Sequence, residues 1–175
     1  MKKIIFSLLF TALLPAAAIM AQDKETELQA DADKGKSAFI NSDGQMQSLF
    51  DNAYGYVIFP NVGKGAIGIG GAAGNGIVYE QGKPVGSAKM KQVNVGFQFG
   101  GQAYREVIFF ENKAALDRFK EGNFEFSGQA SAVAVTKGAS GNVKYGNGVM
   151  VFTQEKGGLM YEASIGGQKF SYKAF

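Results

Sequence analysis

Residues 61–86 read NVGKGAIGIGGAAGNGIVYEQGKPVG, a stretch in which glycine or alanine fills most positions from Gly63 to Gly76. The strand-like segment Gly76 to Tyr79 follows directly. Glycine weakens a strand, because it has no side chain to pack and loses much conformational entropy on folding. It is kept where a strand bends or bulges, or where another backbone or a ligand approaches closely. The stretch therefore predicts a strongly curved sheet, or a surface on which the backbone meets a partner.

Residues 1–21 have the features of a secretory signal peptide. Lys2 and Lys3 form a basic start, and Ile4 to Ala18 is an apolar segment too short to cross a membrane comfortably. We expect cleavage after Ala21, with a cut after Ala18 as the alternative. An N-terminal membrane anchor is the competing interpretation, and the absence of cysteine excludes a lipoprotein anchor. Export predicts a periplasmic or secreted protein.

The rest of the chain is predicted to form one domain with an uneven distribution of charge. Residues 22–54, an expected helical segment, carry a net charge of −4, and residues 55–175, the expected β-rich body, carry +5. A basic body can meet anionic lipid headgroups or nucleic acid, and the predicted export disfavours nucleic acid. An ordinary solvated surface is the alternative.

Three segments have apolar residues at helical spacing, with polar residues on the opposite side. They are Glu25 to about Phe39, Met46 to Ala53, and Asn112 to Glu121. Ser42 is predicted to cap the second helix, with Gln45 completing a capping box. Asn112 is predicted to cap the third helix, and Gly122 to end it.

Nearly all remaining segments have the pattern of short strands separated by glycine turns. About eight such strands and few helices predict a mainly β fold, an antiparallel barrel or sandwich. Small residues on one side of several strands favour a tight β-barrel core, with the three short helices packed outside. Two loops, Gln81 to Pro84 and Lys137 to Asn147, are predicted to be mobile.

The composition argues against an enzyme. The chain has no histidine, cysteine or tryptophan, which excludes histidine bases, cysteine nucleophiles and the common zinc sites. The acidic residues follow no pairing motif. The segment Gly68 to Ala73 loosely fits a dinucleotide fingerprint, but a strand follows where that motif needs a helix. Asp31 and Asp33 begin like a calcium loop that fails at Lys34. We therefore predict no cofactor and no metal.

Several short motifs resemble one known family in order and spacing. In chain order they are Tyr56–Pro60 (YVIFP), Lys64-Gly65, Gly70–Gly76 (GGAAGNG), Gly96–Gln102 (GFQFGGQ), Val107–Phe110 (VIFF) with Ala115–Phe119, Gly157–Met160 (GGLM) and Ala163–Gly167 (ASIGG). Through them the stretch from about Lys36 to Phe175 resembles the SYLF domain family. The resemblance implies a β-barrel core with mobile loops and about three outer helices. It also implies binding of anionic lipids, phosphoinositides in the better-known members, and no enzymatic activity.

The chain departs from the family pattern at Thr136 to Asn142. Many members have a Gly-Pro-x-Gly-Arg turn there, and this chain lacks the arginine. Lys137 and Lys144 can supply charge nearby, but without the bidentate geometry of an arginine.

The functional hypothesis is an exported, non-enzymatic domain that docks on anionic phospholipid or phosphoinositide-like headgroups. The predicted headgroup contacts are lysines near loops and strand ends: Lys64, Lys89, Lys91, Lys137 and Lys144. Five such lysines would contribute roughly 5 kcal/mol at best, so a second contribution is needed. Insertion of Met46, Leu49 and Phe50 into the bilayer is one candidate, although packing of these three on the core is favoured.

Two alternatives remain at this point. One is a soluble barrel that binds a small apolar ligand or a protein partner. The other is an eight-stranded outer-membrane barrel, which fits the size, the signal peptide and the terminal Phe175. Against it, the side of the last strand that carries Phe175 would also expose Lys169 and Lys173 to lipid. The lipid preference, the oligomeric state and the protein partner are left open.

Overall fold

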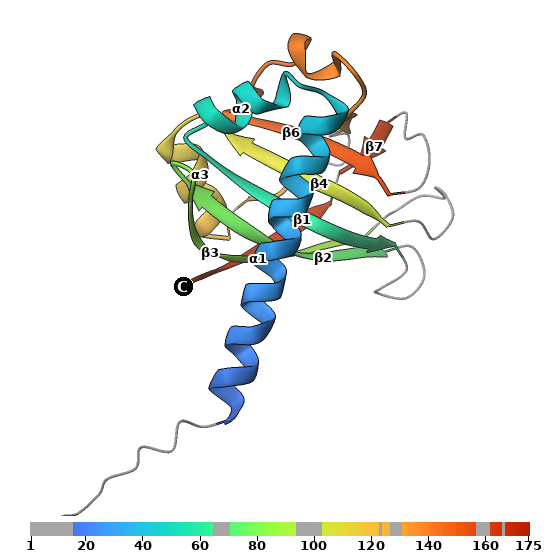
Figure 1. Ribbon diagram of the computed structural model, residues 1–175. Coiled ribbons are helices and arrows are strands. Elements are labelled where there is room, and N and C mark those ends of the chain that lie inside the picture. The colour runs from blue at the N-terminus through green and yellow to red at the C-terminus, as the bar shows by residue number, and fades with distance from the viewer. Residues whose placement is uncertain are drawn as a thin grey trace, which may run out of the picture.

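The computed structural model describes residues 16–64, 71–93, 103–122, 124–126, 131–156, 162–165 and 167–175. In these residues one curved β-sheet is combined with three α-helices and a short 3-10 helix (Figure 1). The helices are α1 (Ala16–Ser42), α2 (Met46–Asn52), α3 (Lys113–Lys120) and the 3-10 helix η1 (Ala139–Asn142). The strands are β1 (Gly55–Lys64), β2 (Gly71–Glu80), β3 (Lys83–Val93), β4 (Tyr104–Phe110), β5 (Ser131–Ala134), β6 (Val149–Glu155), β7 (Glu162–Ser164) and β8 (Gln168–Ala174).

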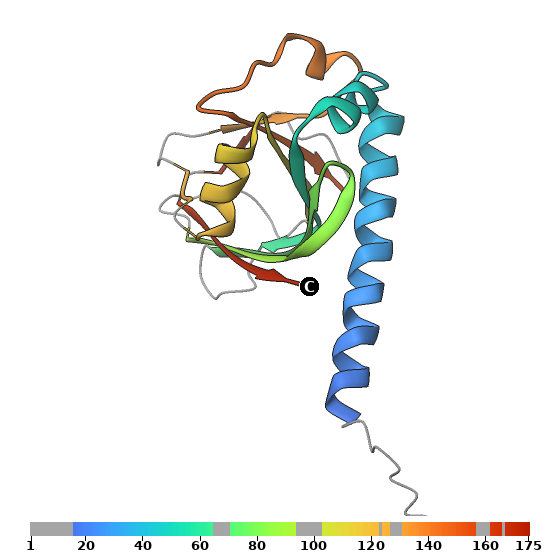
Figure 2. The same ribbon diagram turned by 90° about the vertical axis from the view of Figure 1, so that its left-hand side faces the viewer.

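The eight strands lie in the order β7-β5-β6-β4-β1-β2-β3-β8. Every neighbouring pair is antiparallel except β5 and β6, which run parallel. The predicted mainly β fold with about three helices is confirmed. The predicted closed barrel is corrected, because within the described residues no ladder joins the outer strands β7 and β8. The result is an open sheet that curls around α3 (Figure 2).

The curvature comes from β-bulges and close backbone contacts. The register of β1 shifts between Ile58 and Asn61, next to Pro60, and that of β2 shifts between Val78 and Tyr79. A bulge bends a strand and increases its local twist. At Gly76 of β2, an added Cβ would lie 2.6 Å from the carbonyl oxygen of Ile58. The glycine-rich stretch therefore includes a position where two backbones approach too closely for a side chain, as predicted.

The sheet has an apolar core on each side. The concave side holds α3, whose Leu116 and Phe119 pack with strand residues such as Phe110. The convex side is covered by α1 and α2, with Phe39 and Phe50 packed over β1, β4 and β6. These helices cover part of the convex side of the sheet, and they leave the convex side of β3 and β8 exposed.

Two of the three predicted helices differ in detail from the structure. Helix α1 begins at Ala16 and so runs through the expected cleavage position after Ala21. The predicted capping box is wrong, because Ser42 is the last residue of α1. Instead the Asp43 carboxylate accepts a hydrogen bond from the Gln45 N–H at 3.1 Å. The hydrogen bond in the turn into α2 is therefore accepted by Asp43, the residue after the predicted cap Ser42.

The third helix agrees closely with the prediction. Asn112 caps α3, since its Oδ1 accepts the Ala115 N–H at 3.0 Å. Gly122, with a φ of 73°, ends the helix in the left-handed region that glycine favours. Local sequence alone therefore predicted both ends of this element.

Both loops predicted to be mobile have defined structures. Gln81 and Gly82, with φ values of 50° and 75°, form a two-residue turn that closes the β2–β3 hairpin. The longer loop contains η1 and is tied to the body by Asp43, whose Oδ2 accepts the Ser140 N–H at 2.9 Å and the Ser140 hydroxyl at 2.6 Å. Among the described residues, none of the helices has the length and apolar character needed to span a membrane.

Candidate functional site

The predicted residues Lys89 and Lys91 lie on the outward, convex side of β3. They alternate with Ala88, Met90 and Gln92, which are buried on the concave side. Both lysines are exposed, and neither has an ion-pair partner within the described part of the chain. The alternation along β3 therefore presents two positive charges on one side of the sheet.

Strand β8 adds two lysines beside this pair. In the antiparallel register Lys91 lies opposite Lys169, and Ser87 lies opposite Lys173. Residues directly opposite on one side of such a pair have Cβ atoms about 5 Å apart. We call these four exposed side chains the basic face: Lys89, Lys91, Lys169 and Lys173. Its one ion pair in the described residues is weak, 3.9 Å between the Lys169 and Glu125 side chains.

Lys169 and Lys173 were missed as binding residues by the sequence argument. The signal was present, because QKFSYKA places a lysine at every fourth position of a strand and thus on one side. What the sequence could not supply is the pairing of the last strand with β3, which lie far apart in the chain.

The other predicted lysines do not join the basic face. Lys137 and Lys144 are exposed on the loop around η1, at the opposite end of the molecule from β3 and β8 (Figures 1 and 2). Lys64 is the last residue of β1, and its side chain lies outside the described part of the structure. The five lysines are therefore not one site.

The predicted membrane-inserting residues are placed mostly in the core. Met46 is fully buried, and Phe50 is 3% exposed with its ring 5.1 Å from that of Tyr56 and 4.9 Å from that of Phe109. Leu49 is half-buried against the same cluster. This agrees with the core packing favoured from the sequence and argues against the alternative, insertion of Met46 and Phe50, since moving them into a bilayer would expose the convex core.

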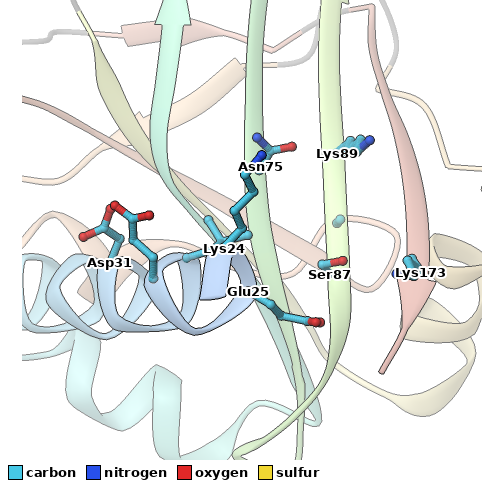
Figure 3. Close-up of a pocket in the computed structure, with 10 residues that line it drawn as sticks. Lys24, Glu25, Asp31, Asn75, Ser87, Lys89 and Lys173 are labelled. Atoms are coloured by element: carbon cyan, nitrogen blue, oxygen red, sulfur yellow. The ribbon is translucent and has the colours of Figure 1, made fainter. Parts of the chain in front are cut away.

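A groove with a volume of about 510 Å³ separates α1 from the basic face (Figure 3). The sheet side of the groove carries Lys89 and Lys173 together with Asn75 and Ser87. The helix side carries Lys24 and three acids, which are Glu25, Glu27 and Asp31. Its volume falls within the range of small-molecule sites, and its two sides differ in charge.

A second polar cluster is buried on the concave side. Glu106 of β4 is fully buried and accepts a hydrogen bond from Gln168 Nε2 at 2.9 Å. Burial raises the pKa of Glu106 to about 7, and the Gln168 hydrogen bond opposes this rise. Glu106 Oε1, Thr153 Oγ1 and Gln168 Oε1 have no hydrogen-bond partner in the described residues. Sequence reasoning missed Glu106. The signal was its position in β4, two residues after Tyr104 and two before Ile108, which both face the concave side.

Among the described residues no group of three or more acidic side chains is arranged to hold a metal ion. Glu106 is accompanied in its cluster by neutral groups, the amides of Gln92 and Gln168 and the hydroxyl of Thr153.

Comparison with known proteins gives two matches. The model of a family described as "Ysc84: Las17-binding protein actin regulator" matches residues 91–174, from β3 to the end of β8. The chain is also similar to the protein named Beta cell expansion factor A of Aeromonas veronii, with 28% identity over 152 residues. That similarity covers 86% of this chain but 58% of the relative, so this chain spans little more than half of the relative's length. The family match includes three of the four lysines of the basic face.

Proposed function

We infer that this chain belongs to the SYLF family, which is associated with lipid binding and is generally non-enzymatic, from the match at residues 91–174 and the similarity to the Aeromonas protein. From that premise we propose that it is an exported, non-enzymatic protein that docks on anionic phospholipid headgroups through the basic face. The basic start and apolar segment of residues 1–21 support export.

The observation that carries the proposal is the clustering of four exposed lysines on two paired strands. Each lysine near an anionic bilayer contributes about 1 kcal/mol, so the basic face contributes about 4 kcal/mol at low salt. Salt screens this attraction within about 10 Å at 0.1 M ionic strength. Electrostatics alone thus gives weak, reversible docking, comparable to that of a single acyl chain.

A second contribution comes from the C-terminus. Phe175 is 55% exposed and is the one large apolar side chain exposed among the described residues. It follows Lys173 by two positions, and its backbone N–H donates to the Val85 carbonyl at 3.3 Å, which continues the pairing with β3. Strand alternation then places the Phe175 ring on the same side as the lysines. Burial of a phenylalanine side chain contributes about 1.5–3 kcal/mol.

The test is flotation of the protein with vesicles of phosphatidylcholine alone or mixed with phosphatidylglycerol, at low and high salt. Wild type is expected to float with the anionic vesicles at low salt and to be released by high salt. The variant with Lys89, Lys91, Lys169 and Lys173 all changed to Gln is expected to lose this binding.

The control carries Lys137→Gln and Lys144→Gln, at the opposite end of the molecule, and is expected to lose less than half of the binding. Wild-type flotation of the basic-face variant would overturn the proposal. So would an equal loss in the control, because two lysines outside the basic face would then contribute as much to binding as the four within it.

A further inference from the structure

The groove between α1 and the basic face has charges of both signs that do not neutralise one another. Among its acids, Asp31 forms an ion pair with Lys34 at 3.1 Å. Glu25 and Glu27 have no ion pair or hydrogen bond in the described part of the chain, and neither have Lys89 and Lys173. The acids and the lysines that face each other across the groove are therefore further apart than the 4 Å of an ion pair.

Such an arrangement suits a ligand that itself carries two charges of opposite sign. We propose that the groove binds a phosphate ester that bears a primary ammonium, the headgroup chemistry of phosphatidylethanolamine. The phosphate lies toward the sheet and the ammonium toward Glu25 and Glu27 of α1. This inference rests on the proposed membrane docking and specifies which headgroup enters beside the basic face.

The phosphate end is supported by the residues that line the sheet side. Lys89 and Lys173 flank Ser87 on β3 and β8, and Asn75 lies opposite Lys89 on β2. Figure 3 shows Lys24 extending from α1 toward Asn75. Ammonium, amide and hydroxyl groups are all hydrogen-bond donors, and those carrying charge form the stronger bonds with phosphate oxygens.

The ammonium end is supported by the acids on α1. Figure 3 shows Glu25 extending from the helix toward β3 and β8. Glu25 is half-buried, and Glu27 is exposed at the edge of the groove. A primary ammonium donates three hydrogen bonds, which ionised carboxylates accept. A quaternary ammonium has no such donors and is recognised by aromatic rings, and no aromatic side chain lines this groove.

The position of the groove fits a headgroup that belongs to the docked leaflet. Lys89 and Lys173 belong to both the groove and the basic face. The start of helix α1 projects past the sheet on the side where β8 ends (Figures 1 and 2), and residues from Lys24 to Asp31 line the groove beside Lys89 and Lys173. When the basic face meets a bilayer, neighbouring headgroups lie at the mouth of the groove.

The experiment measures flotation with vesicles that contain a constant fraction of phosphatidylglycerol, the remainder being either phosphatidylcholine or phosphatidylethanolamine. The protein is used as isolated, with its N-terminus determined by mass spectrometry. Binding is expected to be about threefold to tenfold tighter with phosphatidylethanolamine, the range for one or two exposed ion pairs. Soluble glycerophosphoethanolamine and glycerophosphocholine, titrated while NMR shifts are followed, separate the headgroup from the bilayer properties of the two lipids.

The variant that carries Glu25→Gln and Glu27→Gln tests the acids of α1. It is expected to bind both vesicle types equally and to retain or increase its affinity for phosphatidylglycerol, because the groove loses two negative charges. Glu121→Gln is the control, since Glu121 is exposed at the end of α3 and lies outside the groove. It is expected to keep the wild-type preference.

The outcomes separate this inference from the proposed function. Absence of wild-type binding to phosphatidylglycerol vesicles would overturn the docking and the inference with it. Binding to phosphatidylglycerol without any gain from phosphatidylethanolamine would overturn only the inference. A gain that persists in the Glu25→Gln, Glu27→Gln variant would overturn it as well, as would equal NMR shifts with both soluble headgroups.

Discussion

At the residue scale, two buried carboxyl groups have opposite environments. Glu106 on the concave side has one hydrogen-bond donor and is surrounded by neutral side chains, so burial favours its protonated form. Asp43 in the turn before α2 accepts hydrogen bonds from the Ser140 N–H and hydroxyl and from the Gln45 N–H. Burial acts to raise the pKa of Asp43, but these hydrogen bonds together hold it below its usual value. The two groups therefore predict opposite dependences on pH.

Glu106 is expected to make the fold less stable as the pH rises from 4.5 through about 7. Its pKa is about 7 in the folded state against 4.5 for the free side chain, so over this range the folded state holds a proton that the unfolded state has lost. The free energy of unfolding falls by about 3 kcal/mol at most over this range. Glu106→Gln, which stays neutral, should remove this dependence. Tyr104 interacts electrostatically with Glu106, and burial keeps its pKa above the range tested.

Urea unfolding between pH 5 and 8 checks the prediction. The free energy of unfolding of Glu106→Gln should approach or exceed that of wild type at the upper end. Parallel pH profiles for the two proteins would show that Glu106 is ionised throughout.

Asp43 is expected to stabilise the fold above the usual carboxyl pKa and to lose this effect as the pH falls, because its folded pKa is lowered. Asp43→Ala leaves the buried Ser140 hydroxyl and N–H without their acceptor, which should cost about 1–3 kcal/mol. Ser140→Ala removes only the hydrogen bond from the hydroxyl and should lower the free energy of unfolding by about 1 kcal/mol. A double-mutant cycle at pH 7 measures the coupling, and additive effects would contradict the contact.

At the element scale, agreement with the sequence was best where an element's ends are set locally. The Asn112 cap and the Gly122 stop of α3 are interactions within a few residues, so the sequence alone could predict them. The turn into α2 was mispredicted because Asp43 also binds Ser140, a contact 97 positions away that fixes its carboxylate. The loop around η1 is ordered by the same contact, and its composition does not reveal this.

The glycines of β1 and β2 are not equivalent. An added Cβ at Gly76 would lie 2.6 Å from the Ile58 carbonyl oxygen and 2.7 Å from the Phe59 ring. Gly76→Ala should therefore lower the free energy of unfolding by about 1–3 kcal/mol, because both strands must shift. Gly63→Ala is the matched control, since its Cβ would have no neighbour within 4 Å among the residues that the structure describes. Thermal unfolding of both variants checks this, and equal melting temperatures would contradict the close approach of β1 and β2.

At the scale of the whole molecule, the basic face is formed by one strand from the middle of the chain and another from its end. Lys91 and Lys169 are opposite one another because β8 returns to pair with β3 at the edge of the sheet. Helix α1 then adds acidic side chains across from Lys89 and Lys173, so the groove carries charges of both signs. Net charge, which the sequence provides, therefore says less about binding than the distribution of charge over the folded surface.

Phe175 is expected to strengthen membrane docking without affecting the fold. Because its side chain is 55% exposed, Phe175→Ala should leave the free energy of unfolding within about 0.5 kcal/mol of wild type. Because the ring is already partly buried, membrane insertion would gain about 1.5 kcal/mol, the lower end of the range for a phenylalanine side chain, and its loss predicts roughly tenfold weaker binding to anionic vesicles with unchanged salt dependence. Flotation across a salt series measures both quantities. A variant that binds as tightly as wild type would exclude insertion of this ring.

The sequence by itself determined the mainly β fold and the third helix, and it indicated sharp bending or close backbone contact in the glycine-rich stretch. These features follow from local hydrophobic period, capping chemistry and the steric limits of glycine, all of which act between near neighbours or at single positions. The tertiary structure alone decided that no ladder joins β7 and β8 in the described residues, and that Lys89 and Lys91 join Lys169 and Lys173 on one surface. Each of these depends on the pairing of distant strands or the packing of a helix on the sheet, which is set by the total burial of apolar surface and not by any short stretch of residues.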